Sequence, residues 1–102
     1  MIKEFLRGSV RVHVLYHASK ERVYGVALLK ELRRHGYRLS PGMLYPLLHR
    51  MERERLLSCE REIVRGKIRK YYAATPKGKR ALEQAKEKIR ELVEEVLEEK
   101  AQ

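Results

Sequence analysis

The sequence predicts a mainly α-helical fold with a small β-hairpin and one long C-terminal helix. Apolar residues recur at helical spacing in three segments of residues 3–57. Two β-favouring runs, residues 57–64 and 68–74, flank Arg65-Gly66-Lys67, and such a pattern indicates a hairpin. After Thr75-Pro76 the apolar residues are spaced three and four apart, which is typical of a long helix with a heptad seam.

The chain of 102 residues has the length of a single domain and buries only a modest core by itself. Its net charge of +10 is unevenly distributed. Residues 1–80 hold 20 Lys and Arg against 7 Glu, whereas residues 81–102 hold 4 against 7, so the two parts carry +13 and −3. The charge distribution therefore predicts that residues 1–80 face a polyanionic partner and that the acidic tail does not.

Several classes of protein are disfavoured by what the sequence lacks. The single cysteine, Cys59, excludes an internal disulfide and a cysteine-rich zinc site. No run is long enough for a membrane span, and the N-terminus lacks the apolar core of a signal peptide, so we expect a soluble cytoplasmic protein without a membrane partner. An enzyme finds little support, because there is no Gly-rich phosphate loop and no nucleophile with a base nearby in sequence.

The first two helices are predicted over residues 3–17 and 23–35, with a connection at residues 19–22 and Gly36 as the stop of the second helix. The third helix is predicted over residues 40–57. Ser40 would cap its free N–H groups, and a proline is tolerated at the first helical position. Pro46 is expected to bend the first turn and a half, or to shift the start to Tyr45, because it cannot donate to the Gly42 carbonyl.

The last helix is predicted to run from Pro76 to near Lys100, roughly 37 Å at about 1.5 Å per residue. Three helices, a hairpin and a further helix form the order of a winged helix-turn-helix, whose third helix enters the DNA major groove. We divide the chain into a winged helix-turn-helix DNA-binding domain, residues 1–75, and a C-terminal dimerisation helix, residues 76–102, within one compact unit. The tail could instead pack on its own body, but its length and the two-fold symmetry of palindromic sites favour a dimer.

Three segments of the sequence resemble the PadR-like family of transcriptional regulators. LSPGMLYPLLHRMERERLL, residues 39–57, is similar to the region of that family's recognition helix. RGKIRKYYAATPKGK, residues 65–79, looks like its wing and the joint to its last helix. FLRGSV, residues 5–10, is similar to part of its first helix.

The resemblance implies a homodimeric repressor of the short subclass, whose single tail helix packs against the partner's first and last helices. It also implies release from DNA when a small molecule, often aromatic or planar, binds near the dimer interface. Ligand-binding members of this subclass often carry a tryptophan in the tail helix, whereas this chain has no Trp and no aromatic residue after Ala81. The family usually has Gly-Tyr-Glu near the start of the second helix, whereas here Tyr24 precedes Gly25.

The third helix and the hairpin carry the residues that we predict to contact double-stranded DNA. Arginine can pair with guanine edges in the major groove, and Lys or Arg at a hairpin tip can reach phosphates. The alternatives are a solvated basic helix face and a sheet edge protected by charge. The predicted DNA contacts are Tyr24, Ser40, Gly42, Met43, Tyr45, His49, Arg50, Arg53, Arg65, Lys67, Arg69 and Lys70.

Apolar residues of the first and last helices are predicted to form the dimer. The predicted dimer contacts are Phe5, Leu6, Leu82, Ala85, Ile89, Leu92, Val93 and Val96. Within the hairpin, Tyr71 and Tyr72 point to opposite faces of one strand, so one of them is expected in the core.

Two histidines raise the question of a metal site. His13, His17 and Glu21 stand four residues apart, and two His at i, i+4 can share a metal on one helix face. A helix that ends near Ala18-Ser19 removes Glu21 from this face, so we favour core or interface histidines and assign neither a metal nor a cofactor. Two other functions stay open: a sequence-tolerant architectural DNA binder, and a metal or ligand sensor whose main partner is a protein.

Overall fold

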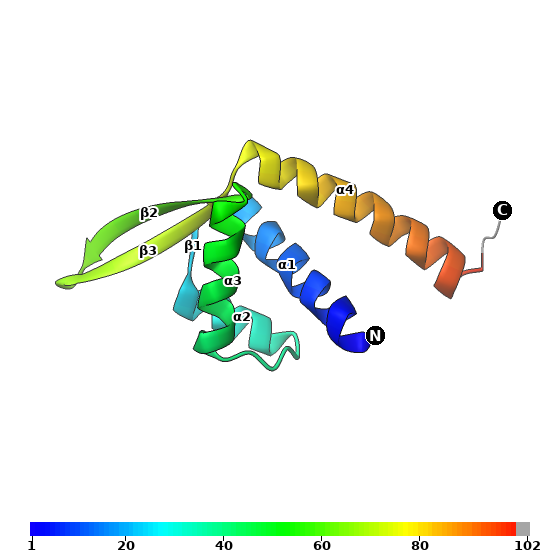
Figure 1. Cartoon of the computed structure of the whole chain (residues 1–102), viewed down its shortest axis with the longest axis horizontal. Coiled ribbons are helices and arrows are strands. Elements are labelled where there is room, and N and C mark those ends of the chain that lie inside the picture. Colours follow the sequence, from blue (N-terminus) through cyan, green and yellow to red (C-terminus); the bar gives the residue numbers. More distant parts are fainter. Residues whose placement is uncertain (100–102) are drawn as a thin grey trace.

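The computed structural model describes residues 1–99 and confirms the predicted order of elements. The described elements are α1 (Ile2–Lys20), β1 (Val23–Tyr24), α2 (Gly25–Arg34), α3 (Pro41–Arg53), β2 (Leu57–Val64), β3 (Lys67–Ala74), α4 (Pro76–Leu92) and the π-helical turn η1 (Val93–Leu97). The β2–β3 hairpin projects from one side of the body, and α4 projects from the other (Figure 1). No described helix combines the length and the apolarity that crossing a bilayer requires.

The core lies where α1, α2 and α3 meet the base of the sheet. Its buried residues are Val10, Val14, Leu15, Ala18, Leu28, Leu29, Leu32, Leu44, Leu47, Leu48, Met51, Leu57, Tyr72 and Leu82. Tyr72 is buried and Tyr71 is half-buried, which confirms that one tyrosine of the pair belongs to the core. Leu82 belongs to the core of its own chain, so we remove it from the predicted dimer surface.

The sheet has three antiparallel strands in the order β1-β3-β2, one more than the sequence predicts. Val23 and Tyr24, predicted to begin a helix, instead pair with Tyr72 and Tyr71. Two residues give no alternation from which a strand can be predicted, and this strand exists only because β3 offers a free edge. At the other end of the sheet, Arg65 and Gly66 have φ of 52° and 78°, as in a two-residue hairpin turn of type I′. Lys67 therefore opens β3 instead of lying in the turn.

The helix α3 begins at Pro41 and continues through Pro46, so the predicted shift of its start to Tyr45 is wrong. The Ser40 side chain makes no cap hydrogen bond, which corrects the predicted capping role of this serine. Its carbonyl instead accepts from the backbone N–H groups of Met43 and Leu44, each at 3.0 Å. The helix ends at Arg53, four residues before the predicted end, because Arg55 adopts a φ of 63°.

The helix α4 begins at the predicted Thr75-Pro76 cap and contacts α1, which runs beside it in Figure 1. Thr75 Oγ1 accepts from the Gly78 N–H at 3.0 Å and donates to the Arg55 carbonyl at 2.6 Å. Gly78 permits this close joint, because a Cβ there would lie 2.1 Å from the Leu56 carbonyl oxygen. The α-helical part ends at Leu92, and the π-helical turn η1 continues the predicted long helix to Leu97. Lys100 lies outside the described residues.

Candidate nucleic-acid interface

The helix α3 has one buried face and one exposed face. The buried face consists of Leu44, Leu47, Leu48 and Met51. All the predicted DNA contacts of this segment are exposed: Ser40, Gly42, Met43, Tyr45, His49, Arg50 and Arg53. Since successive helical residues are rotated by about 100°, those from Gly42 to Arg53 occupy one arc opposite the core.

A groove of about 820 Å³ separates this exposed arc from the hairpin. The groove is lined by residues of α3, by Tyr24 and the start of α2, and by residues of the hairpin, most of them near its tip. The groove brings together seven predicted DNA contacts: Tyr24, Tyr45, His49, Arg65, Lys67, Arg69 and Lys70. Four of these seven are Lys or Arg, so the groove presents positive charge beside the helix.

Two arginines and two tyrosines alternate on the surface of the sheet. The Arg22 guanidinium lies 4.0 Å from the centre of the Tyr71 ring, and that of Arg69 lies 4.2 Å from the Tyr24 ring. The two tyrosine rings meet edge to face with centroids 5.7 Å apart. Arg69 also donates from Nη1 to Tyr71 Oη at 3.4 Å, and Arg22 pairs with Glu62. These contacts position Tyr24 and Arg69. No local pattern in the sequence points to the role of Arg22, because its partners Tyr71 and Glu62 come from β3 and β2.

Tyr45 lies against the start of α2 at a point where no side chain stands in its way. A Cβ at Gly25 would lie 2.4 Å from Cε1 and 2.6 Å from the hydroxyl oxygen of Tyr45. Gly25 is therefore needed for the position of Tyr45. The sequence reading missed it, since the contact joins residues twenty positions apart.

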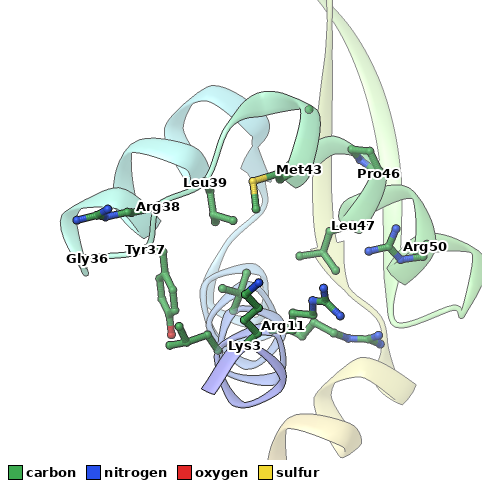
Figure 2. Close-up of a pocket in the computed structure, with 14 residues that line it drawn as sticks. Lys3, Arg11, Gly36, Tyr37, Arg38, Leu39, Met43, Pro46, Leu47 and Arg50 are labelled. Atoms are coloured by element: carbon green, nitrogen blue, oxygen red, sulfur yellow. The ribbon is translucent and has the colours of Figure 1, made fainter. Parts of the chain in front are cut away.

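A second hollow of about 920 Å³ lies on the other side of α3, between α1 and the loop before α3. Figure 2 shows Met43, Leu47 and Arg50 of α3 directed toward the side of α1 that carries Lys3 and Arg11. Five Lys or Arg side chains line it: Lys3, Arg7, Arg11, Arg38 and Arg50. Its apolar lining consists of Leu6, Val10, Tyr37, Leu39, Met43, Pro46 and Leu47. The predicted DNA contacts Gly42, Met43 and Arg50 thus lie on this flank of α3.

An exposed helix beside a basic hairpin is the arrangement of winged-helix DNA-binding proteins, and comparison with known proteins decides the family. Residues 14–84 match the transcriptional regulator PadR-like family. The chain belongs to this family. It is 49% identical over 96 residues to the transcriptional regulator Rv3488 of Mycobacterium tuberculosis, an alignment that covers 94% of this chain and 90% of that protein.

Solved structures of PadR-family regulators share the fold. A regulator from Eggerthella lenta superposes with a TM-score of 0.83 at 36% identity, over 96% of this chain and 87% of that chain. A regulator from Bacillus cereus superposes with a TM-score of 0.79 at 36% identity, over 92% of this chain and 96% of that chain. This PadR-like protein is therefore a DNA-binding transcriptional regulator, and the family confirms the prediction that it is no enzyme.

The predicted dimer residues of this PadR-like regulator fall into three groups. Leu82 is buried, Ala85 and Val93 are half-buried, and the remaining residues are exposed: Phe5, Leu6, Ile89, Leu92 and Val96. The exposed group occupies the N-terminal part of α1, the C-terminal part of α4 and η1, which lie on the same side of the molecule in Figure 1. These five apolar side chains remain available for association, as the sequence predicts for the dimer.

Proposed function

We propose that this regulator is a homodimeric repressor of a palindromic operator, with α3 in the major groove and the β2–β3 wing along the flanking backbone. The observation that supports this proposal most directly is the groove between α3 and the hairpin. It gathers the exposed helix arc and the basic wing tip on one side of the protein, where a single duplex can contact both.

The residue types assign different tasks to the helix and to the wing. Arg50 and Arg53 are exposed on α3, and an arginine fork can pair with the O6 and N7 of guanine. Arg65, Lys67 and Lys70 are exposed around the hairpin tip, where they suit phosphate contacts that position the protein without reading sequence. The helix would therefore supply specificity and the wing would supply affinity that weakens as salt rises.

A dimer would place two such interfaces side by side. The tail helix leaves Ile89, Leu92 and Val96 exposed, and α1 leaves Phe5 exposed. Pairing these surfaces about a two-fold axis would bury them and present two α3 helices to successive half-sites of a palindrome.

Release by a small ligand is a further part of the proposal, supported by the second hollow. Its apolar lining and five cationic side chains suit a small, planar, aromatic anion. Leu6 lines this hollow and is also predicted to face the partner chain. A bound ligand would touch Met43 and Arg50 from the side, so it would compete with DNA for one flank of α3.

The decisive experiment is fluorescence anisotropy with the DNA upstream of this protein's own gene, compared with a scrambled duplex over a series of salt concentrations. We expect a preference of roughly a thousandfold or more for the upstream DNA, within the usual range for specific binding. Equal binding to both duplexes, fading together as salt rises, would contradict repression of its own gene and leave an architectural DNA binder or a regulator whose operator lies elsewhere.

A pair of charge-removing variants tests the role of the wing in the same assay. Arg65→Asn keeps the turn, because asparagine tolerates the positive φ of this position. It should make the fall of log affinity with log salt less steep, by about one unit of slope for each wing. Arg90→Asn removes the same charge from the exposed surface of α4, away from the groove, and should leave the slope unchanged.

A further inference from the structure

Three histidines from two helices converge outside the DNA-binding groove. His13, His17 and His35 each place a ring nitrogen within 4.8 Å of the other two. The ring centroids lie 6.3 Å apart for His13 and His17, 5.1 Å for His13 and His35, and 6.4 Å for His17 and His35. We propose that this histidine cluster binds one late first-row divalent transition ion, of the class of Ni²⁺, Cu²⁺ and Zn²⁺.

The three positions come together through packing of the helices. The i, i+4 spacing places His13 and His17 on one face of α1, as the sequence predicts, whereas Glu21 lies beyond the helix end. The third histidine is His35, the residue that caps the C-terminus of α2, where α2 packs against α1. No local pattern in the sequence connects His35 with the other two, so the sequence reading found only the pair.

The spacing of the ring nitrogens is close to that of a metal site. Zinc–nitrogen bonds of about 2.0–2.1 Å in a tetrahedral site separate the ligand atoms by about 3.3 Å. Separations within 4.8 Å therefore have to close by about 1.5 Å at most to reach the tetrahedral value of about 3.3 Å. Rotation of the imidazoles about χ1 and χ2 can supply a movement of this size without displacing either helix.

One of the ring nitrogens has a particular need for a partner. Nε2 of His17 is buried and has no hydrogen-bond partner among the described residues. Buried polar atoms in native proteins are nearly always paired with protein, water or an ion. A bound cation would satisfy this nitrogen, and the exposed His35 leaves the cluster open for an ion to enter from solvent.

The surroundings favour the neutral imidazoles that bind metal. Burial lowers the pKa of His13, and the neighbouring His35 and His17 lower it further. Burial also lowers the pKa of His17; Glu31 opposes this, while His35, Lys20 and Arg34 add to it. Since a metal displaces protons from its ligands, rings that are already neutral at pH 7 bind it at lower cost.

The other groups around the cluster complete its chemistry. Glu31 Oε1 lies 3.6 Å from His35 Nε2 and 2.5 Å from Arg34 Nη2. A carboxylate beside a metal-binding histidine fixes the orientation of its ring. The Tyr37 ring lies edge-on to His13 with centroids 5.3 Å apart, and the Tyr16 ring lies edge-on to His17 at 5.1 Å.

The choice of ion follows from the type and number of ligands. Imidazole suits late first-row ions, whereas Ca²⁺ and Mg²⁺ prefer oxygen ligands. Three protein ligands leave one or more coordination positions open to water. Cys59 lies in β2 and supplies no thiolate to this cluster.

The cluster lies where an ion could influence α3. His35 is followed by Gly36, whose φ of 92° turns the chain toward α3, and by Tyr37, whose hydroxyl bonds the Ser9 hydroxyl. An ion bound to the cluster would fasten this turn to α1 and so restrain the start of α3. This consequence for DNA binding rests on the proposed function, whereas the metal site itself does not.

A titration of the untagged full-length protein with Co²⁺, followed by visible absorption and by competition with Zn²⁺, tests the site. We expect one ion per chain. His17→Gln and His35→Gln should each weaken binding at least about 100-fold, because even groups beside a metal ligand contribute roughly 10–100-fold. His49→Gln, which changes the one histidine outside the cluster, should leave the affinity unchanged.

Absence of ion binding by the wild-type protein would overturn the proposal, as would equal losses in all three variants or unchanged affinity in both cluster variants. Circular dichroism of each variant separates loss of ligands from loss of fold. The titration contains no DNA, so its outcome and that of the operator assay are independent: either proposal can fail while the other stands.

Discussion

Gly25 leaves room for the Tyr45 ring at the predicted DNA interface because glycine has no side chain. A Cβ at this position would overlap the ring of Tyr45, so Gly25→Ala should push Tyr45 out of the groove between α3 and the wing. If Tyr45 contacts DNA, its displacement should weaken operator binding by about tenfold or more, in line with the roughly 1–3 kcal/mol of one good base contact. Fluorescence anisotropy with the operator duplex measures the loss.

Gly8→Ala is the matched control for this substitution. Nothing lies within 4 Å of a Cβ built at Gly8, which is exposed in α1. Its replacement should leave DNA binding unchanged and stabilise the helix by about 0.5–1 kcal/mol. If Gly25→Ala binds the operator as tightly as Gly8→Ala does, Tyr45 has no role that depends on its position.

The histidine cluster predicts a pH dependence of stability. The pKa values of His13 and His17 lie below their ordinary value of 6.5 in the folded protein, chiefly through burial. Their contribution to the free energy of unfolding is therefore fully present above pH 6.5 and is lost as the pH falls toward the lowered pKa values, because the unfolded chain then binds more protons. Urea unfolding at a series of pH values from about 7.5 to about 5 should show this decline.

A His13→Gln/His17→Gln double variant should show a flatter profile in the same window. The carboxylates whose pKa values are shifted, Glu4, Glu31 and Glu62, are lowered from 4.5, so their titration falls below the histidine window. An equally steep profile in the double variant would assign the dependence to other groups.

The helix α3 contains an internal proline that is expected to lower its stability, so a functional role explains this residue better. Pro46 lies inside the helix and leaves the Gly42 carbonyl without its usual N–H donor. Pro46→Ala should raise the midpoint of thermal unfolding, with an upper limit of about 3 kcal/mol in stability. It should also weaken operator binding, since Pro46 is exposed in the middle of the helix arc and shapes the first turns.

Pro41→Ala supplies the comparison for this prediction. Pro41 stands at the first helical position, where a proline costs little because its N–H would have no helical partner. Its replacement should change stability much less than Pro46→Ala. A Pro46→Ala variant that gains stability and keeps full affinity would leave the proline unexplained.

Elements with strong local signals were predictable from the sequence, and those that depend on a neighbour were not. The start of α4 follows from Thr75-Pro76, whose threonine caps the helix as expected. The start of α3 at Pro41 was also predictable, but the Ser40 hydroxyl forms no cap bond, although serine is a common capping residue. Strand β1 has no pattern of its own, since its existence depends on the edge of β3.

At the scale of the whole molecule, the sequence identified many candidate residues but not the contacts between them. The basic residues of the wing and the exposed residues of α3 were predicted separately, and the fold brings them to one groove. The approach of His35 to His13 and of Tyr45 to Gly25 depends on how helices pack, which no local spacing encodes. Leu82 was misassigned for the same reason, because one heptad stripe serves the core at one end of α4 and is exposed at the other.

The change along α4 from buried to exposed apolar residues gives a test of the proposed dimer. Leu92 is 45% exposed, and Phe5 on α1 is 62% exposed. Leu92→Glu would place a charge on the apolar surface, and losing a buried leucine contact of roughly 1.5–3 kcal/mol should weaken dimerisation by about tenfold to a hundredfold or more. Sedimentation equilibrium measures the change.

Operator binding should fall together with dimerisation in this variant, because each α3 helix of the proposed dimer would read one half-site and a monomer would lose the second. Gln84→Glu adds the same charge to the exposed surface of α4, outside the apolar stripe, and should leave both dimerisation and DNA binding unchanged. A wild-type protein that sediments as a monomer would contradict the proposed dimer, and a Leu92→Glu variant that stays dimeric would place the partner surface elsewhere. In the second case the exposed Ile63 and Ile68 of the wing would be the next apolar surface to test.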